Sequence, residues 1–415
     1  MKIRSITCFF NPAAPSSKDT LKRFATFVSQ AVFRFNQAGF EVQTTRLATV
    51  PFPQCFPLLE PDHLLSQVQE WEAEASLNGF SYLSLGPALP EFPQSYAVIP
   101  ALLAATRNVF FSAVMASRGA GVNLWAVKAC ARIITQNALL TPDGFTNLRF
   151  AALANVPPGA PFFPAAYHDT SQLKFALAVE CADIARNAFS GVVSIAAGRK
   201  RLLNDLESAA QKLTTISRDL SSQFDLQFGG IDFSPAPFPL DSCSLAGAME
   251  TLGVPKIGLA GSLSAAAIIA DTLDQGQWPR AGFNGLMLPV LEDSVLALRS
   301  GEGVLTIRDL LLFSAVCGAG LDTVPLPGGI TPEELASLLA DLAALSVRLD
   351  KPLTARLMPV PGKNAGERTG FDFEFFANGG VLPTHAAPLN GLLASDEIFP
   401  LKPRPWNGSS ELGEN

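Results

Sequence analysis

The chain has few charged residues, few histidines and no long apolar run. Charged residues make up 16% of the 415 residues, hydrophobic residues make up 48%, and there are three histidines. Residues 97–106 are interrupted by Pro100, and residues 304–316 contain Arg308 and Asp309, so neither stretch reaches the roughly 18 uncharged apolar residues of a membrane span. The start of the chain lacks the long apolar segment of a signal peptide. We therefore expect a cytoplasmic protein with no membrane partner.

Paired cysteines and clustered basic residues are also missing. The six cysteines, at positions 8, 55, 130, 181, 243 and 317, include no Cys-x-x-Cys pair, so we expect reduced thiols with neither a disulfide framework nor a zinc site. The formal net charge is −7, which argues against a nucleic-acid partner because such binding depends on clustered Lys and Arg. The one basic cluster, residues 199–201, is interpreted as a solvated turn.

Segments with strand and helix patterns alternate along the chain. Apolar residues recur at helical spacing between Leu21 and Phe35, after an expected strand at 2–9 and before one at 40–47, which is typical of a βα unit in a parallel sheet. The length suits two domains or one large α/β barrel, and no Gly/Ser linker or repeat divides it. The other expected strands are 82–85, 109–115, 147–154, 173–179, 226–233, 285–291, 321–326 and 354–358. Expected helices include 124–137, 200–222, 242–252, 262–273, 306–316 and 332–349.

About ten strands separated by helices predict one closed or strongly curved parallel sheet. We expect a single α/β domain over residues 1–394 and a loosely attached tail over 395–415, which contains three prolines and a Gly-Ser-Ser. Ligands of such sheets collect at the carboxyl ends of the strands. The loops that leave the strands are therefore the candidate sites.

The first candidate loop, residues 117–123, lies between an expected strand and an expected helix. It contains Ser117, Asn123 and two glycines, which would let backbone N–H groups face an anion at the helix N-terminus. It matches neither a Walker P-loop nor a Rossmann fingerprint. A tight structural turn explains the same glycines.

The second candidate loop, residues 161–169, contains His168 next to a tyrosine and an aspartate. A histidine in this setting suits a general base or a metal ligand. A hydrogen-bonded structural histidine is the alternative.

The third candidate loop, residues 229–242, combines a strand end, three prolines and three side-chain oxygens. Asp232 and Asp241 are nine residues apart with Ser234 between them, so together they would bind a cation, orient a water molecule or share a proton. The alternative is that Asp232 ends a strand and Asp241 caps backbone amides. Ser242 is expected to cap the following helix.

The fourth candidate loop, residues 317–322, contains Cys317 between small residues and ends at Asp322. A reactive cysteine needs a lowered pKa or a radical partner, and the sequence indicates neither. Close packing of a helix on a strand explains the glycines equally well. Glu292 and Asp293 are expected at the start of a helix, where acids offset the helix dipole.

Taken together and in order, these motifs resemble the family called domain of unknown function 711 over nearly the whole chain, up to about residue 388. The motifs are 3–7, Ser117 with Gly121 and Asn123, Pro161-Phe162 leading to His168, 231–242, Pro289-x-x-Glu292-Asp293, Cys317-x-x-Gly320-Leu321-Asp322, Arg356-x-x-Pro359, Gly362-Lys363 and Gly379-Gly380. The resemblance implies a ten-stranded α/β barrel like that of the pyruvate formate-lyase type glycyl radical enzymes, with a loop threaded into it, and a homodimer.

The sequence motifs that those enzymes need for radical chemistry are only partly present in this chain. They resemble one another in an Arg-Val-x-Gly-Tyr loop and a finger-loop cysteine, whereas Gly379 and Gly380 lack the Arg-Val and the Tyr. Cys317 is the one cysteine that would take the role of the finger-loop cysteine, and the chain has no Cys-Cys pair. Ala260 also stands where relatives are expected to carry a histidine.

We therefore expect a small polar molecule in the barrel mouth of an enzyme or a protein derived from one, with the substrate, reaction, cofactors and any metal left open. A non-catalytic metabolite-sensing homodimer is the alternative, and a glycyl radical enzyme is a further one. The expected catalytic residues are His168, Asp232, Asp241 and Cys317. The expected ligand-binding residues are Ser117, Asn123, Ser234, Asp322, Arg356 and Lys363.

Overall fold

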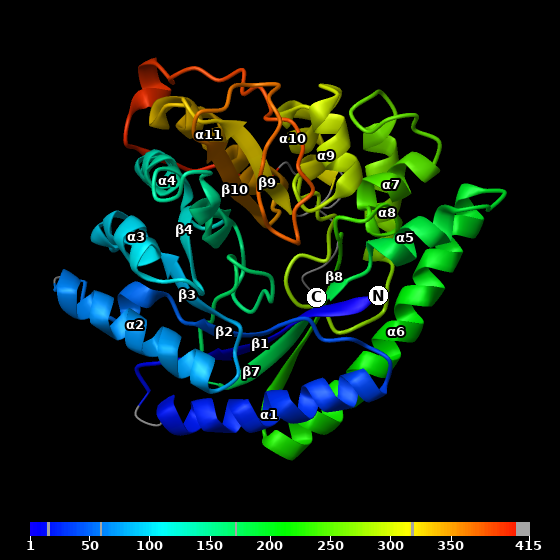
Figure 1. The fold of residues 1–415 in the computed structure, drawn as a ribbon, viewed down its shortest axis with the longest axis horizontal. Coiled ribbons are helices and arrows are strands. Elements are labelled where there is room, and N and C mark those ends of the chain that lie inside the picture. Colours follow the sequence, from blue (N-terminus) through cyan, green and yellow to red (C-terminus); the bar gives the residue numbers. More distant parts are fainter. Residues whose placement is uncertain (15–16, 59, 171, 317–318, 404–415) are drawn as a thin grey trace, which may run out of the picture.

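The computed structural model describes residues 1–415 except 15–16, 59, 171, 317–318 and 404–415. A strongly curved sheet encloses the centre of the molecule, and helices surround the sheet on its outer side (Figure 1). Loops that follow the strands occupy the concave inner side. The α/β class predicted from the sequence is confirmed.

The strands form one eleven-stranded sheet. Its main path runs in the order β8-β7-β1-β2-β3-β4-β6-β10-β9, and β5 and β11 branch from β4. The strands are β1 Lys2–Phe10, β2 Thr45–Thr49, β3 Tyr82–Ala88, β4 Val109–Ser117, β5 Gly121–Asn123, β6 Phe150–Ala154, β7 Lys174–Glu180, β8 Gln227–Ala236, β9 Gly320–Pro327, β10 Leu353–Val360 and β11 Ile398–Phe399.

The strand directions divide the sheet into a central group and two flanking pairs. β1, β2, β3, β4 and β6 run parallel to one another. β7 and β8 are parallel to each other but antiparallel to β1, and β9 and β10 are parallel to each other but antiparallel to β6. The predicted all-parallel sheet is therefore wrong, because alternation of strands and helices along the chain does not determine which strands become neighbours.

The described strands do not close into the predicted ten-stranded barrel. Residues 280–289 lie between the two edge strands and make one isolated bridge to each, Ile231 with Arg280 and Asp322 with Pro289. The strand predicted at 285–291 is thus absent from this described segment. Pro279 and Pro289 have no backbone N–H to donate to a neighbouring strand, which explains why the bridges do not extend into ladders.

Eleven α-helices occur in the described part of the chain, and the long ones match the apolar periodicity of the sequence. α11 begins with a capping box, in which Thr331 and Glu334 satisfy each other's backbone N–H groups. α3, which contains Pro100, was not among the predicted helices. The helices are α1 Ser17–Gln37, α2 Pro61–Leu77, α3 Gln94–Ala105, α4 Leu124–Ala138, α5 Ala182–Phe189, α6 Ile195–Phe224, α7 Leu245–Thr251, α8 Ser262–Asp274, α9 Ser294–Gly301, α10 Ile307–Val316 and α11 Pro332–Leu349.

The loop between β6 and β7 packs against the inner face of the sheet. Thr7 Oγ1 of β1 donates a hydrogen bond to the backbone oxygen of Pro161 at 2.9 Å, and Ser84 Oγ of β3 donates to that of Ala166 at 2.8 Å. These buried hydroxyls hold the loop in the concave side of the sheet. The loop thereby occupies space that a closed sheet would otherwise fill with its own side chains.

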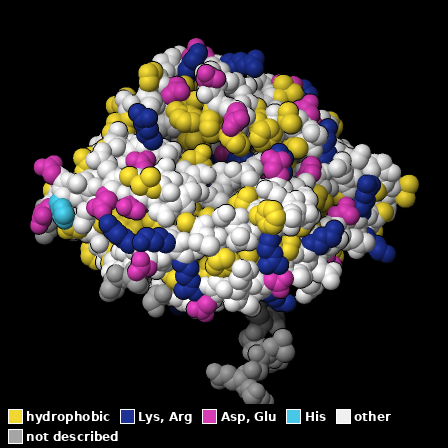
Figure 2. All heavy atoms as spheres, turned by 60° about the horizontal axis from the view of Figure 1, so that its bottom comes forward, with side chains coloured by type: hydrophobic (Ala, Val, Ile, Leu, Met, Phe, Trp, Pro, Cys, Tyr) yellow, Lys and Arg dark blue, Asp and Glu magenta, His cyan; other side chains and the backbone are white. Residues whose placement is uncertain are grey.

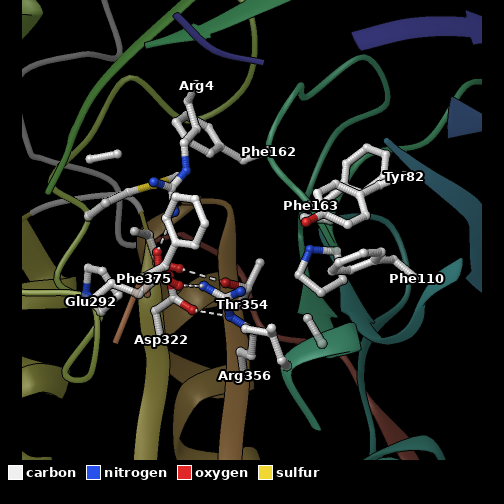
Figure 3. Close-up of a pocket in the computed structure, with 18 of the residues that line it drawn as sticks. Arg4, Tyr82, Phe110, Phe162, Phe163, Glu292, Asp322, Thr354, Arg356 and Phe375 are labelled. Atoms are coloured by element: carbon white, nitrogen blue, oxygen red, sulfur yellow. Dashed lines mark hydrogen bonds and ion pairs between the residues drawn. The ribbon is translucent and has the colours of Figure 1, made fainter. Parts of the chain in front are cut away.

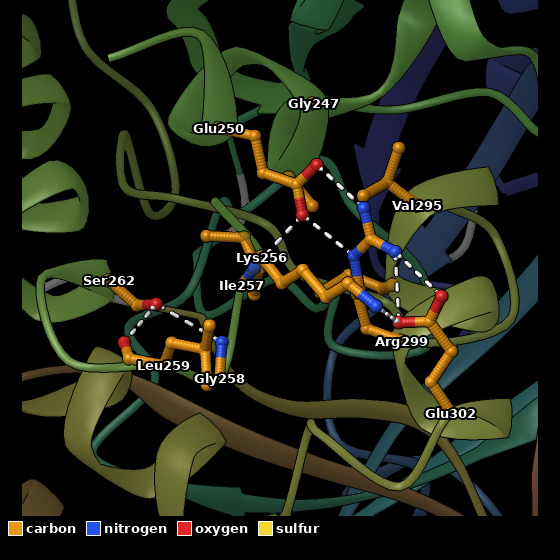
Figure 4. Close-up of polar contacts among 12 residues, drawn as sticks. Gly247, Glu250, Lys256, Ile257, Gly258, Leu259, Ser262, Val295, Arg299 and Glu302 are labelled. Carbon is orange, nitrogen blue, oxygen red and sulfur yellow. Dashed lines mark hydrogen bonds and ion pairs between the residues drawn. The ribbon is translucent and has the colours of Figure 1, made fainter. Parts of the chain in front are cut away.

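An ion-pair network joins α7, α9 and the loop that contains Ala260 (Figure 4). Arg299 donates to Glu250 Oε1 at 2.8 Å and to Glu302 Oε2 at 2.9 Å, and Lys256 also pairs with Glu302. Ile257 N donates to Glu250 Oε1 at 2.9 Å. The network accounts for the position of this loop without a histidine at residue 260.

The last described residues lie along α4. β11 pairs with β5, and Lys128 Nζ donates to the backbone oxygen of Ser395 and pairs with Asp396, each at 2.9 Å. None of the helices that the structure describes has the length and apolar character needed to cross a membrane. On the face that Figure 2 presents, Lys and Arg alternate with Asp and Glu, so the described residues of this face form no broad patch of one charge.

Candidate functional site

A cavity of about 100 Å³ lies inside the curved sheet. Its walls include one residue from near the start of each of four parallel strands, namely Arg4, Arg46, Tyr82 and Phe110. The loops that fill the concave side supply much of the remainder (Figure 3). The cavity therefore lies at the amino ends of the parallel strands β1 to β4, opposite to the carboxyl ends where the sequence predicted a site.

Seven aromatic side chains line the walls. They come from strands, from the β6–β7 loop, from residues 280–289 and from the segment after β10, so four separate parts of the chain enclose the cavity. Apolar walls raise the strength of any charge interaction inside because they exclude water. The aromatic residues are Tyr82, Phe110, Phe162, Phe163, Phe283, Phe373 and Phe375.

Five charged side chains form a continuous row, and all of them except Glu180 line one side of the cavity. Arg4 pairs with Glu180 at 3.2 Å and with Glu292 at 2.8 Å. Arg356 pairs with the other oxygen of Glu292 at 2.7 Å and with Asp322 Oδ1 at 2.6 Å. The row thus alternates in sign from Glu180 to Asp322, and the dashed contacts around Glu292, Asp322 and Arg356 are visible in Figure 3.

Burial and ion pairing shift the pKa values of Arg356 and Glu180, two groups of this row, in opposite directions. Burial alone would lower the pKa of Arg356, but the carboxylates of Asp322 and Glu292 raise it above its ordinary value. Burial raises the pKa of Glu180, while Arg4 and Gln43 oppose the rise. Arg356 therefore stays in its charged form, and two of its nitrogens already donate to protein carboxylates.

Arg46 is the exception among the cavity arginines because it has no carboxylate partner in the described part of the chain. Its Nε donates to Thr44 Oγ1 at 2.9 Å, and its guanidinium carbon lies 5.1 Å from the Phe163 ring centre and 5.6 Å from that of Tyr82. The residue is 8% exposed. Burial, together with repulsion from Arg4 and Arg356, lowers the pKa of Arg46 to about 9, so it is still a cation at neutral pH.

Two of the sequence-predicted ligand residues lie together in the cavity. Asp322 follows the start of β9, Arg356 lies in β10, and the two strands are neighbours. The prediction that Arg356 faces a ligand anion directly is weakened by its two carboxylate partners. Thr354, two residues earlier on the same strand face, also lines the cavity.

His168 is buried away from this cavity, near the carboxyl ends of β1 and β2. Its backbone N donates to Thr49 O at 2.9 Å, its Nε2 lies 3.3 Å from Thr170 Oγ1, and its ring packs on Phe9. Burial is the main cause that lowers the pKa of His168. These contacts match the structural alternative.

Asp232 is fully buried, and its carboxylate accepts hydrogen bonds from protein donors. Ser234 Oγ donates to Oδ1 at 2.6 Å, Asn284 N donates to the same oxygen at 2.9 Å, and Phe283 N donates to Oδ2 at 2.7 Å. A Cβ atom on Gly282 would lie 2.1 Å from Oδ2, so the backbone can approach only because residue 282 is glycine. Asp232 and Ser234 hold residues 282–285 in place and do not line the cavity.

The remaining predicted residues also lie outside the cavity. Asp241 is exposed and accepts from Ser294 Oγ at 2.8 Å, and the side chain that caps α7 is that of Ser244, not Ser242. The Asn123 side chain caps α4. Ser117 Oγ accepts from Ala120 N, and Lys363 lies in a turn where its backbone oxygen accepts from Gly328 N.

Cys317 lies outside the described residues. Among the described cysteines, burial raises the pKa of the Cys8 and Cys181 thiols well above the ordinary value and that of Cys55 to about 12, which suits inert thiols. No group of three or more His, Cys, Asp or Glu that would hold a metal ion occurs in the part of the chain that the structure describes.

Sequence reasoning missed Arg46, Arg4, Glu180 and the role of Glu292. One sequence feature pointed to Arg46, because it is a charged residue inside a short strand. All five residues of that strand, β2, are buried. A buried arginine in a strand needs a partner or a function. The expectation that acids start a helix holds for Asp293, which caps α9, but Glu292 turns into the cavity.

Comparison with other proteins shows what the chain is similar to. The sequence profile of the family described as "Uncharacterised ACR (DUF711)" matches residues 1–374. A UPF0210 protein of Pyrobaculum arsenaticum is 32% identical over 395 residues, which cover 88% of this chain and 87% of that protein. A UPF0210 protein of Syntrophobacter fumaroxidans is 31% identical over 334 residues, or 72% of this chain and 71% of that protein.

Proposed function

The chain belongs to the DUF711 (UPF0210) family, and we propose that it binds a small organic anion in the interior cavity, as an enzyme or as a protein derived from an enzyme. The cavity has space for several water molecules, so the ligand is a small molecule. Its walls are mainly apolar and aromatic with a few polar groups, as is typical of small-molecule sites.

The observation that carries the proposal is the unpaired guanidinium of Arg46. A buried charge without a counter-ion is costly, and proteins retain one where it serves a ligand or a reaction. The two terminal nitrogens of Arg46 donate to no acceptor among the described residues, so the edge of the guanidinium that binds a carboxylate in two parallel hydrogen bonds is free. Arg4 and Arg356 are positioned nearby but are held by carboxylates.

The test is ligand-induced thermal stabilisation with acetate, propionate, isocaproate, hydrocinnamate and phosphate at constant ionic strength. We expect at least one organic anion to raise the melting temperature of the wild type and to lose at least about tenfold in affinity with Arg46→Gln. Arg34→Gln is the matched control because Arg34 pairs with Asp219 on the surface. A response that is equal in both variants, or absent for every anion, contradicts the proposal.

The glycyl radical alternative depends on Gly379, Gly380 and Cys317. Close packing on α9 accounts for both glycines, since a Cβ on Gly379 would lie 2.5 Å from Ser300 Oγ and one on Gly380 would lie 2.7 Å from Ser300 O. The homodimer and the relation to the glycyl radical enzyme fold that the family resemblance implies stay proposals, whereas the described strands do not form the closed barrel. Sedimentation analysis of the full chain tests the dimer.

A further inference from the structure

The charges around the cavity are divided between two poles. Arg46 and the rings of Tyr82 and Phe163 form the positive pole. Asp322 forms the negative pole, because Arg356 pairs with only one of its two carboxylate oxygens. Figure 3 shows Tyr82, Phe110 and Phe163 on one side of the cavity and Glu292, Asp322 and Arg356 on the other.

The negative pole has acceptor atoms without protein donors. Arg356 occupies Asp322 Oδ1, whereas Oδ2 accepts no hydrogen bond from any described residue. Gln43 lines the same cavity, and its Nε2 donates to Glu180 at 2.7 Å while its Oε1 is buried without a partner. A buried acceptor of this kind costs free energy unless a donor reaches it.

We propose that the ligand anion is one end of a zwitterion, a small amino acid with an apolar or aromatic side chain; this inference rests on the proposed function. Its carboxylate pairs with Arg46, and its ammonium group donates to Asp322 Oδ2 or Gln43 Oε1 across the cavity.

The distribution of charge inside the cavity favours this class over a simple carboxylic acid. A simple acid would pair with Arg46 and leave Asp322 Oδ2 without a donor. A zwitterion places each of its charges next to the opposite pole. The ring face of Phe162, which also lines the cavity, is electron-rich and attracts an ammonium group, whereas the guanidinium of Arg4 already lies over the ring of Phe375.

The inference is tested with two matched sets of probes, leucine with isocaproate and isoamylamine, and phenylalanine with hydrocinnamate and phenethylamine. Calorimetric titration of the full chain at pH 7 measures each affinity. We expect one amino acid to bind at least about tenfold more tightly than its acid and its amine. Asp322→Asn should abolish the preference over the acid while the acid still binds, Asp322→Glu should restore it in part, and Asp241→Asn is the matched surface control.

The outcomes separate this inference from the proposed function. If an acid binds as tightly as its amino acid and Arg46→Gln removes both, the zwitterion is wrong and the anion site stands. If neither amino acid binds, this inference is overturned, and the anion panel decides the proposed function. Should Asp322→Asn fail to fold, Gln43→Leu and the wild-type comparison of amino acid with acid decide the result.

Discussion

At the scale of single residues, Arg46 and His168 are both buried bases that form no ion pair with a described residue. Both have lowered pKa values, and burial is the largest cause in each case. Arg46 lies in the cavity, whereas the contacts of His168 are those of a packed core residue. A pKa lowered by burial therefore occurs both at a candidate ligand site and at a structural group. The position of the side chain, in the cavity or in the packed core, distinguishes the two cases.

The lowered pKa of His168 predicts a loss of stability on acidification. Between its ordinary value of 6.5 and its lower folded value, the unfolded chain binds a proton that the folded chain does not, so the free energy of unfolding falls as the pH falls. We expect His168→Gln to be less sensitive than the wild type between pH 7 and pH 5.5 in urea titrations. Equal slopes for the two proteins would contradict this.

The lowered pKa of Arg46 predicts a loss of anion affinity in alkali. The guanidinium is charged below about 9 and loses its proton as the pH rises through that value, so the affinity for isocaproate should fall by up to about tenfold per pH unit above it. Calorimetric titrations at pH 7, 9 and 10 measure the change. An affinity that is constant across this range would show that another group binds the anion.

At the scale of elements, one buried carboxylate connects two helices. Asp293 Oδ1 accepts from Ser244 Oγ, Val295 N and Leu296 N, and Oδ2 accepts from Leu245 N and Ala246 N. The side chain therefore satisfies amides at the start of both α7 and α9.

This double capping predicts an unusually large mutational effect. Asp293→Ala should lower the free energy of unfolding by about 3 kcal/mol or more, because several buried donors lose their acceptor at once. Thr331→Ala, which removes a single exposed cap from α11, should cost about 1 kcal/mol. Urea denaturation of both variants checks the difference, and similar losses would contradict the double cap.

At the scale of the whole molecule, the last described residues of the chain bind to the start of α4 and to β5. Leu124 N donates to Glu397 O at 3.0 Å, and β11 pairs with β5. Removing residues 395–415 deletes these contacts, and we expect the free energy of unfolding to fall by about 2 kcal/mol. A chain that ends at residue 403 keeps them and serves as the control. Equal melting temperatures for the two truncated chains would show that the contacts contribute nothing.

The sequence by itself determined most helices, most strands and the family. The helix α11 is an example, since its predicted range 332–349 agrees with the structure. Its limits are set locally, by the spacing of its apolar residues and by its N-terminal cap. The same local patterns failed at Pro100, inside α3, and at the predicted strand 285–291, where tertiary contacts override propensity.

Only the tertiary structure decided where the site lies. The row of charges joins Arg4 and Glu292, which are 288 residues apart, and Asp232 became a structural group because amides 51 and 52 residues away reach it. Strand order and register bring such residues together, and neither can be read from the periodicity of one segment. The unpaired state of Arg46 is likewise a property of the assembled cavity, because it depends on which carboxylates are already occupied by other arginines.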